Sequence, residues 1–573
     1  MMKLKNTALI LFCFGMFHSA YCQRLWRSEV LGRPGEHSIT VQLLFADSAD
    51  VRVQYGTVSA QYDHETAWST YADSVTVEII LSDLKPATHY FYRVNYRKPG
   101  RQNILNLQEH SFTTKRDKQD SFVFTVQADP HLDGMSDSAL YRVCLKNQLE
   151  DRPDFMIDLG DFLMTDKLQN ASKVVPFDTI PYRCNLLRSM YESICHSVPL
   201  FIALGNHEGE AGWLNNVTAN NIAVWDARER KRFFPNPYPD GFYTGDTSNT
   251  PFVGLRQSFY SWEWGNALFI VLDPYWYTKP KPDSLHGWNW TLGKAQYDWL
   301  RQTLDNSKAD FKFVFAHQLI GGDDQGRGGV EFADLYEWGG KNLDGSDGWA
   351  TQRPGWYKPI KDLLTEHRVN IFFHGHDHFF GQQQKDCLIY QETPQPSLPN
   401  FNYPRQAADY GYVQGVIQSN TGHLRVCVNG ERVKVEYVKA YRVSQETSSQ
   451  HNKDVVATYF INLKNCYDSL NTGTTVIWNS QYADQIAYPN PFTDQTKISF
   501  EIKNTDHLTL DIFNDNGLWL RRLMDDNALE SGSYQVIWDG KDFQGASVNS
   551  GNYYYKIQSR SNGAVTGKVI YLK

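Results

Sequence analysis

The 573-residue sequence has no long apolar run after its first 22 residues. Because a membrane-spanning helix requires about 20 mostly apolar residues in a row, we expect no transmembrane segment. The sequence also has no Cys-X-X-Cys pair, the usual signature of zinc knuckles and thioredoxin-like redox sites. Basic residues are in the minority, with 56 Lys and Arg against 64 Asp and Glu. The resulting formal net charge of −8 favours solubility and argues against a nucleic-acid partner.

The first 22 residues have the order that is typical of a secretory signal peptide. Lys3 and Lys5 precede an apolar stretch over residues 8–17, and Ser19-Ala20-Tyr21-Cys22 follows it. Such a segment is too short to span a membrane. Cys22 raises the alternative of a lipid anchor, but Tyr21 is bulkier than the small residue that such sites place before the cysteine. We therefore expect export, with the protein secreted or held at the outer cell surface.

Six cysteines remain beyond the predicted signal peptide: Cys144, Cys184, Cys195, Cys387, Cys427 and Cys466. An even number in an exported protein permits up to three disulfides, with 15 pairings. We expect the pairs Cys184–Cys195 and Cys387–Cys427. Buried free thiols are the alternative.

Five polar motifs each follow a short apolar segment. They are Asp129-Pro130-His131, Gly160-Asp161, Gly205-Asn206-His207-Glu208, Ala316-His317 and Gly375-His376-Asp377-His378. Short apolar runs of this kind indicate buried strands, and in α/β sheets ligands gather beyond the carboxyl ends of the strands. Asp, Asn and His bind hard to borderline divalent cations, and these motifs hold enough of them for two ions. Strand-ending turns explain any one motif, but not five that carry His, so we predict a dinuclear metal hydrolase.

With these motifs, residues 120–440 resemble the calcineurin-like metallophosphoesterase superfamily, which includes the purple acid phosphatases. The resemblance implies one metal ion held by Asp129, His131, Asp161 and His378, and a second held by Asp161, Asn206, His317 and His376. Asp161 would bridge the two ions. His207 matches the histidine that contacts the phosphate and can protonate the leaving group. In the family, a hydroxide that bridges the metals attacks phosphorus in line.

Two positions depart from the purple acid phosphatases. Those enzymes carry a metal-binding tyrosine where this chain has Met164, and a glycine where it has His131. The histidine restores the number of ligands, and the missing tyrosine removes the ferric charge-transfer colour. We expect a non-purple relative that uses two divalent ions of manganese, zinc or iron.

Three further residues lie beside the predicted ligands. Asp158 and Glu208 are expected to orient ligand histidines, with plain turn roles as the alternative. His374 precedes the last motif by one residue, and the Gly-His-X-His spacing favours His376 and His378 as ligands instead. We therefore place His374 in the core or behind the ligands.

Residues 24–115 alternate apolar and polar in short segments, which indicates a small antiparallel sandwich. The segment from Leu81 to Tyr90 resembles the corner of fibronectin type III domains, where a tyrosine hydroxyl ties back to the backbone. We expect this domain to give structural support.

Residues 486–573 form another β-rich unit. It opens with Tyr488-Pro489-Asn490-Pro491-Phe492 and contains Trp538-Asp539-Gly540 and the run from Ser550 to Lys556. It resembles the carboxy-terminal sorting domain of proteins that certain Gram-negative bacteria export by type IX secretion, which implies that machinery as a partner. The alternative is an immunoglobulin-like adhesive or packing module. Residues 441–485 are expected to be a connector with one strand near residues 455–463.

The predicted architecture is multidomain. A fibronectin type III-like β-sandwich precedes an α/β metallophosphoesterase domain, with a β-sandwich core flanked by helices, and a C-terminal immunoglobulin-like β-sandwich. Aromatic-rich insertions over 209–262 and 274–310 are expected mainly to pack on the core, with stacking of a base or sugar as the alternative. Gly321 to Gly329 lacks the ending of a nucleotide P-loop and is expected to be a flexible loop.

The predicted function is hydrolysis of small phosphate monoesters by a secreted enzyme. A phosphodiesterase for nucleotide or phospholipid-type esters is the alternative, because the same two-metal site serves both. A surface binding protein without turnover is a third reading, since fold alone does not determine function.

Overall fold

The structure is a computed structural model that describes residues 25–573, except 171, 324, 402–404, 449, 463–485, 503–504, 515–518, 531 and 560–562. The predicted signal peptide and most of the predicted connector lie outside the described residues. Among the helices of the described residues, none combines the length and apolar character needed to cross a membrane.

The amino-terminal domain is an antiparallel sandwich of two sheets. One sheet has the order β1-β2-β6, with bounds Leu25–Gly32, Ile39–Phe45 and Thr76–Leu81. The other has the order β4-β3-β7-β8, with β5 and β9 also paired to it; the bounds are His64–Glu65, Ala49–Gly56, His89–Arg97, Leu105–Asn106, Ser69–Tyr71 and His110–Thr113. Alternate residues of β6 are buried, as the sequence pattern indicates. The Tyr90 hydroxyl accepts a hydrogen bond from the backbone N–H of Lys85 at 2.9 Å.

The central domain is built on two larger sheets. The six-stranded sheet has the order β12-β11-β10-β21-β22-β23, with bounds Leu200–Ile202, Phe155–Asp158, Phe122–Gln127, Gly422–Asn429, Arg432–Lys439 and Val455–Asn462. The eight-stranded sheet has the order β13-β14-β15-β16-β17-β19-β18-β20, with bounds Thr244–Gly245, Tyr260–Trp264, Ala267–Val271, Phe311–Phe315, Ile371–His374, Leu388–Glu392, Phe380–Lys385 and Val416–Gln418. β10, β11 and β12 run parallel, and so do β15, β16 and β17.

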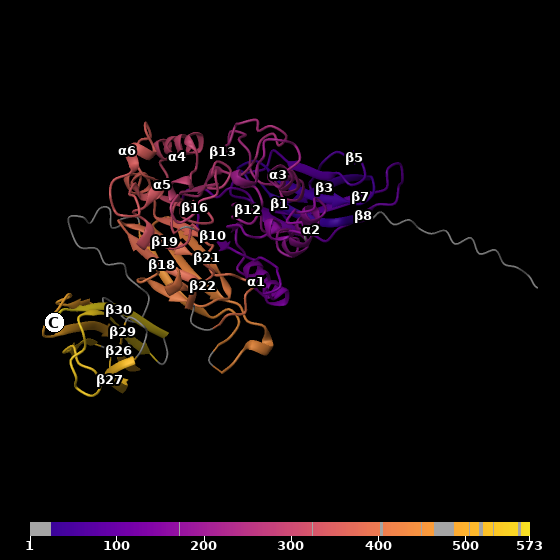
Figure 1. Cartoon of the computed structure of the whole chain (residues 1–573). Coiled ribbons are helices and arrows are strands. Elements are labelled where there is room, and N and C mark those ends of the chain that lie inside the picture. Colours follow the sequence, from indigo (N-terminus) through magenta and orange to yellow (C-terminus); the bar gives the residue numbers. More distant parts are fainter. Residues whose placement is uncertain are drawn as a thin grey trace, which may run out of the picture.

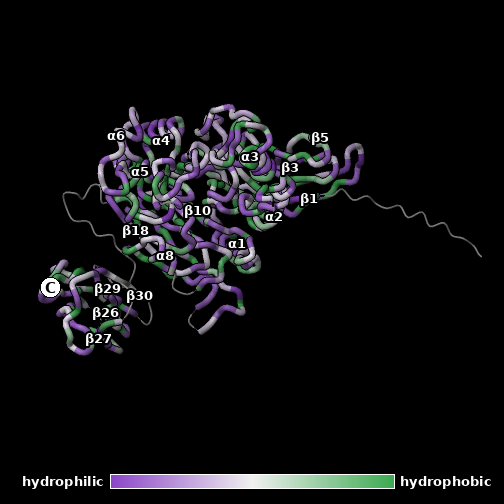
Figure 2. The backbone as a smooth tube through the Cα atoms, viewed as in Figure 1, coloured by the Kyte–Doolittle hydropathy of each residue, from purple (hydrophilic) through white to green (hydrophobic). Residues whose placement is uncertain are grey.

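The two central sheets enclose an aromatic core. The Phe124 ring of β10 lies 5.1 Å from that of Phe269 in β15 and 5.6 Å from that of Phe313 in β16. Both distances fall within the range in which aromatic pairs attract beyond simple burial. Figure 2 shows hydrophobic residues concentrated in the interior of this domain and hydrophilic residues on its outer loops. This core holds the parallel strands with their carboxyl ends at a common edge.

Helices cover the outer faces of the central domain and fill its insertions (Figure 1). The α-helices are α1 Ser138–Glu150, α2 Thr179–Tyr191, α3 Ile222–Phe233, α4 Lys294–Asn306, α5 Tyr336–Gly339, α6 Trp349–Gln352, α7 Ile360–Glu366 and α8 Arg405–Asp409. Single 3-10 turns are η1 Thr165–Lys167, η2 Gly212–Leu214, η3 Gly287–Asn289, η4 Val330–Phe332 and η5 Val443–Gln445. The Asp137 side chain caps α1 by accepting from the N–H groups of Ala139 and Leu140.

The carboxy-terminal domain is a second antiparallel sandwich. Its sheets are β24-β25-β28, with bounds Ile486–Tyr488, Thr496–Ile502 and Gly532–Trp538, and β27-β26-β29-β30, with bounds Trp519–Leu529, Asp506–Asn514, Gly551–Ser559 and Gly563–Tyr571. Phe492 packs on Trp538 and Tyr571 in its core. The strand expected within the connector is β23, which pairs with β22 and completes the six-stranded central sheet. β23 therefore belongs to the central domain.

The predicted disulfide pairs are wrong. Cys144, Cys184, Cys195 and Cys427 are free thiols. Cys387 is disulfide-bonded, so its partner is not Cys427. The first three of the free thiols are fully buried and fill the core as small apolar side chains, a role that spacing in the sequence does not reveal.

The amino-terminal sandwich packs against the central domain on the side of α2 and α3 (Figure 1). Val30 and Leu44 of the sandwich belong to one buried apolar cluster with Leu187 of α2. The Tyr92 hydroxyl donates to the carbonyl of His196 at 2.7 Å. The His110 ring stacks on that of His196, with ring centroids 3.8 Å apart.

The stacked histidines make the stability of this contact dependent on pH. Burial, together with the neighbouring His196, lowers the pKa of His110 from 6.5 to about 4. The unfolded chain therefore binds more protons between these two values, so this contribution to stability is complete above about pH 6.5 and is lost as the pH falls toward 4. Glu29 lies 3.5 Å from the His110 ring, but burial raises its own pKa and weakens its charge as a counterion.

We expect the melting temperature of the wild-type protein to fall more steeply from pH 7 to pH 4 than that of a His110→Phe variant. Phenylalanine keeps a ring on His196 but does not titrate. Scanning calorimetry across this pH range measures the difference. The same pH dependence in both proteins would contradict the assignment.

Candidate metal centre

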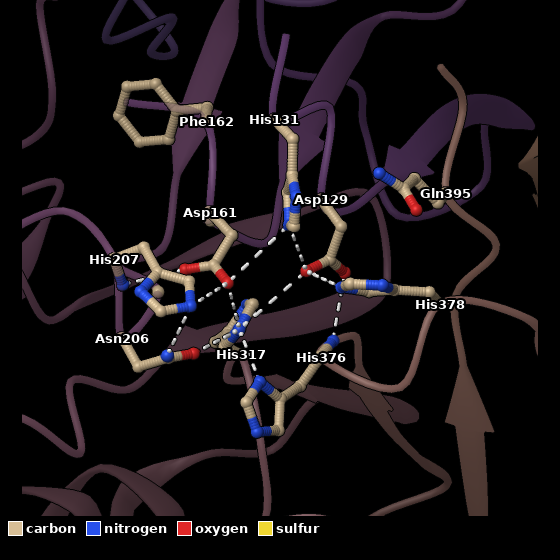
Figure 3. A network of polar contacts seen from close by, with 12 residues as sticks. Asp129, His131, Asp161, Phe162, Asn206, His207, His317, His376, His378 and Gln395 are labelled. Carbon is tan, nitrogen blue, oxygen red and sulfur yellow. Dashed lines mark hydrogen bonds and ion pairs between the residues drawn. The ribbon is translucent and has the colours of Figure 1, made fainter. Parts of the chain in front are cut away.

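The predicted ligands all lie in loops that follow strands of the two central sheets. Asp129 follows β10, Asp161 follows β11 and Asn206 follows β12. In the other sheet, His317 follows β16, and His376 and His378 follow β17. The packing of the two sheets brings the five loops to one place, which Figure 3 shows. All seven predicted ligands and His207 are neighbours there.

The backbone of these loops is unusual. Five predicted ligands have left-handed φ angles, namely Asp129 (58°), His131 (46°), Asp161 (56°), His376 (79°) and His378 (64°). Asp and His tolerate this conformation better than most residues do. A Cβ atom at Gly205 would clash with the Asp161 carboxylate, so the third motif requires glycine where it passes the second. The motifs thus consist of residues that suit sharp turns as well as metal binding.

The side chains form two adjoining groups. In the first, His378 Nε2 lies 3.3 Å and His131 Nε2 3.6 Å from Asp129 Oδ1. In the second, His317 Nε2 lies 3.2 Å from both Asp161 Oδ2 and His376 Nδ1. Each group brings its ligand atoms close enough to hold one ion.

Asp161 lies between the two groups. Its Oδ2 atom is 3.2 Å from His317 Nε2 and 3.8 Å from His131 Nε2. Asn206 joins the second group, since its Oδ1 atom is 3.1 Å from His317 Nε2. In the predicted division of ligands, this carboxylate would be shared by two ions.

The donor set fits divalent metal ions. Asp129 Oδ1 and His131 Nε2 are buried and have no hydrogen-bond partner among the described residues. Burying unpartnered polar atoms is costly, and two such atoms with lone pairs facing each other are accounted for by a cation between them. Carboxylate, imidazole and amide oxygen ligands are typical of manganese, zinc and iron sites.

Burial and neighbouring charged groups shift the pKa values of the predicted ligands. Burial alone would raise the pKa of Asp129, but His378 and His317 hold it well below its usual range. Burial likewise opposes ionisation of Asp161, whose pKa His317 and His207 hold well below the usual range. Burial lowers the pKa of His376, which favours the neutral ring that binds metal.

A histidine–aspartate pair borders the second group. His207 Nδ1 lies 2.9 Å from Asp166 Oδ1, and its Nε2 atom lies 4.0 Å from Asp161 Oδ2. Asp166 thus engages Nδ1, while Nε2 lies 3.0 Å from Asn206 Nδ2 on the side of the metal groups. Asp166 is not among the residues predicted from the sequence, although it lies only five residues after Asp161 in the same loop, on η1.

Asp158 and Glu208 do not orient histidines, so both predictions are wrong. Asp158 accepts from Gln127 Nε2, the Tyr191 hydroxyl and the N–H of Gly160. The Glu208 carboxylate accepts from the backbone N–H groups of Asp161 (2.9 Å), Phe162 (2.8 Å), Leu163 (3.0 Å) and Gly205. Both carboxylates hold the backbone of the loops instead of the rings of the ligands.

A second carboxylate holds the last motif in the same way. Glu392 Oε1 accepts from the N–H groups of Asp377 and His378, each at 3.1 Å, and its Oε2 atom lies 2.8 Å from His374 Nδ1. His374 thereby lies behind the ligands and outside both metal groups. Glu392 is distant in sequence from the motif, and no spacing rule pointed to it.

Hydrogen bonds from Arg327 fix the position of the loop over 321–329. Its Nη1 atom donates to the carbonyl of His376 at 2.6 Å and to Asp377 Oδ1 at 3.1 Å. The guanidinium also lies over the Tyr410 ring, 4.4 Å from its centroid. The loop is therefore tied to the fifth ligand loop, whereas its sequence predicted a plain flexible loop.

Most aromatic residues of the insertions pack against the core. Phe233, Phe234, Tyr243 and Trp290 are buried. Trp213 makes edge contacts with Tyr275 and Trp290. These contacts agree with the expected packing role.

Comparisons with known proteins agree with this geometry. Residues 122–380 match the family model described as calcineurin-like phosphoesterase, and residues 484–563 match the FlgD Ig-like domain. No curated protein sequence matched the chain. The chain therefore contains a calcineurin-like metallophosphoesterase domain, followed by an immunoglobulin-like domain.

Two solved structures illustrate the likeness. The structure titled "Structure of PhoD" is 14% identical, covers 78% of this chain and 92% of its own, and has a TM-score of 0.56, which shows a shared fold. A putative 5'-nucleotidase from Staphylococcus aureus is 17% identical and covers 58% of this chain and 56% of its own. Its TM-score of 0.31 is too low to support an argument.

We expect Asp161→Ala to lose both metal ions and all measurable activity, because one carboxylate serves both groups. Asp158→Asn is a matched control, since Asp158 is equally buried three residues earlier but contacts neither group. It should keep both ions. Elemental analysis of the two purified variants gives the answer, and two tightly held ions in Asp161→Ala would refute the assignment.

Proposed function

We propose that the chain is an exported enzyme that hydrolyses small phosphate monoesters. The observation that supports this most directly is the pair of adjoining metal groups with His207 at their border. When bound, the two ions would activate water as the nucleophile and offset the negative charge of the phosphoryl group. A dianionic monoester carries more charge than a diester and gains more from this concentration of positive charge.

The chain's own residues supply the remaining chemistry. Asp129, His131 and His378 would hold one ion, and Asn206, His317 and His376 the other, with Asp161 between them. His207 Nε2 is placed to donate a proton to the departing alcohol oxygen. Asp166 accepts from the Nδ1–H of the same ring, and the proton to be transferred is the second one, carried on Nε2 of the imidazolium.

The ester class is tested by steady-state kinetics on matched aryl phosphate mono- and diesters, together with elemental analysis of the mature protein. About two ions per chain and a higher kcat/KM for the monoester support the proposal. A higher kcat/KM for the diester would establish a phosphodiesterase. Bound metal without turnover of either ester would favour a binding role.

Export rests on the pattern of the first 22 residues and on the motifs of the last domain. We include type IX secretion in the proposal, and a fibronectin type III identity for the amino-terminal sandwich, which the Tyr90 corner supports. Cell fractionation with peptide mass mapping of the product tests export. A cytoplasmic, uncleaved chain would contradict it.

We expect Asp166→Asn to keep both ions and to lower kcat about 10- to 100-fold for esters with poor leaving groups, because His207 loses the carboxylate that orients its proton. Esters with good leaving groups need little protonation and should be hydrolysed at nearly the wild-type rate. His207→Ala should show the same dependence with larger losses.

The measurement is a series of aryl phosphates with leaving groups of graded pKa. Asp133→Asn is the control, because Asp133 pairs with the ligand His131 and not with His207. Equal losses across the series in Asp166→Asn would argue against the acid role of His207.

A further inference from the structure

Helix α2 carries two buried arginines, five residues apart. Arg183 is 5% exposed and Arg188 is fully buried. A guanidinium is always charged and has five N–H donors, so each arginine needs several acceptors in the interior. The acceptors differ between the two, and this difference indicates what each arginine does.

Arg183 binds the carbonyl groups of two ligand loops. It donates to the carbonyls of Leu163 (2.5 Å), Leu132 (3.0 Å), Phe162 (3.4 Å) and His131. These residues are the ligand His131 itself, the residue after it, and the two residues after the ligand Asp161. The Arg183 side chain thus links the backbones of the first two motifs.

Glu208 supports the same turn with a side chain of the opposite charge. Its carboxylate accepts the N–H groups of Asp161, Phe162 and Leu163, while the Arg183 guanidinium donates to the carbonyls of Phe162 and Leu163. The turn after Asp161 therefore has its donors satisfied by an anion and its acceptors by a cation. Both partners bind the backbone of ligand residues and not the ligand atoms of the metal groups.

The supported turns are the strained ones. Asp161, His131 and Leu132 all have left-handed φ angles of 46–56°. Backbone in this region persists only where its surroundings hold it there. The contacts of Arg183 and Glu208 supply this restraint at two of the five ligand loops.

Arg188 faces the amino-terminal sandwich instead. It donates to the carbonyls of Ser28 (2.8 Å), Gln42 (2.6 Å) and Phe233, and to the Gln42 side chain. Ser28 lies in β1 and Gln42 in β2. Arg188 is therefore a natural comparison for Arg183, because it is the same residue type on the same helix and is also buried, but donates to no ligand loop.

We propose that Arg183 is a positioning residue of the metal centre, which holds the turns of His131 and Asp161 in the conformation that binds metal. The inference rests on the proposed metal-dependent function and goes beyond it, because it assigns a role to a residue outside the ligand set. It also predicts that this role is separate from any contribution of Arg183 to overall stability.

The experiment compares Arg183→Met, Arg183→Lys and Arg188→Met with the wild-type full-length protein. Each protein is stripped of metal with a chelator and titrated with Mn²⁺ by calorimetry, and the melting temperature of its metal-free form is measured. Both Met variants leave buried carbonyls without a partner, so both should melt at a lower temperature than the wild type. Only the Arg183 variants should bind Mn²⁺ about tenfold or more weakly.

The lysine variant separates charge from geometry. Lysine keeps the positive charge but cannot spread its donors over four carbonyls on two turns, so Arg183→Lys should also bind Mn²⁺ more weakly. If Arg183→Met does not fold, Arg183→Lys decides the question.

Wild-type Mn²⁺ affinity in the folded Arg183 variants would overturn the proposal. An equal loss of affinity in Arg188→Met would also overturn it, because the effect would then come from the fold as a whole. A wild-type protein that binds no Mn²⁺, Zn²⁺ or Fe²⁺ would instead contradict the proposed function, and the inference with it.

Discussion

The site depends on a set of left-handed turns at the ends of parallel strands. Each such turn at a non-glycine residue costs about 1–3 kcal/mol, and five of the predicted ligands have this conformation. The turns redirect the chain sharply after each strand, so that neighbouring side chains such as His376 and His378 can face different metal groups. The surrounding hydrogen bonds make this conformation the stable one.

Buried charges provide much of that support. Glu208 and Glu392 accept backbone N–H groups of the second and fifth ligand loops, and Arg183 and Arg327 donate to carbonyls of the same regions. A buried carboxylate or guanidinium is costly unless it is fully paired, and backbone groups in irregular loops need partners for the same reason. The buried charged side chains and the loop backbone groups serve as hydrogen-bond partners for each other. The loops consequently keep their shape without regular secondary structure.

The amino-terminal sandwich takes part in this arrangement through α2. Its residues Val30 and Leu44 share an apolar cluster with Phe162 and Leu163, which directly follow the ligand Asp161. The apolar cluster that the two domains share therefore extends to Phe162, the residue next to the ligand Asp161. A domain expected only to give support thus shares one apolar cluster with the residues that follow Asp161.

The sequence by itself determined the ligand types, their order and the strands that precede them. Those properties are local, because apolar runs and turn residues follow from short stretches of chain. The separate sandwiches at both ends were also predictable from alternating segments and turn residues. Only the tertiary structure decided the roles of Asp166, Arg183, Glu208 and Glu392, and which cysteines are free thiols. These depend on which distant segments meet when the sheets pack, and hydrogen bonds between such segments leave no periodic pattern in the sequence.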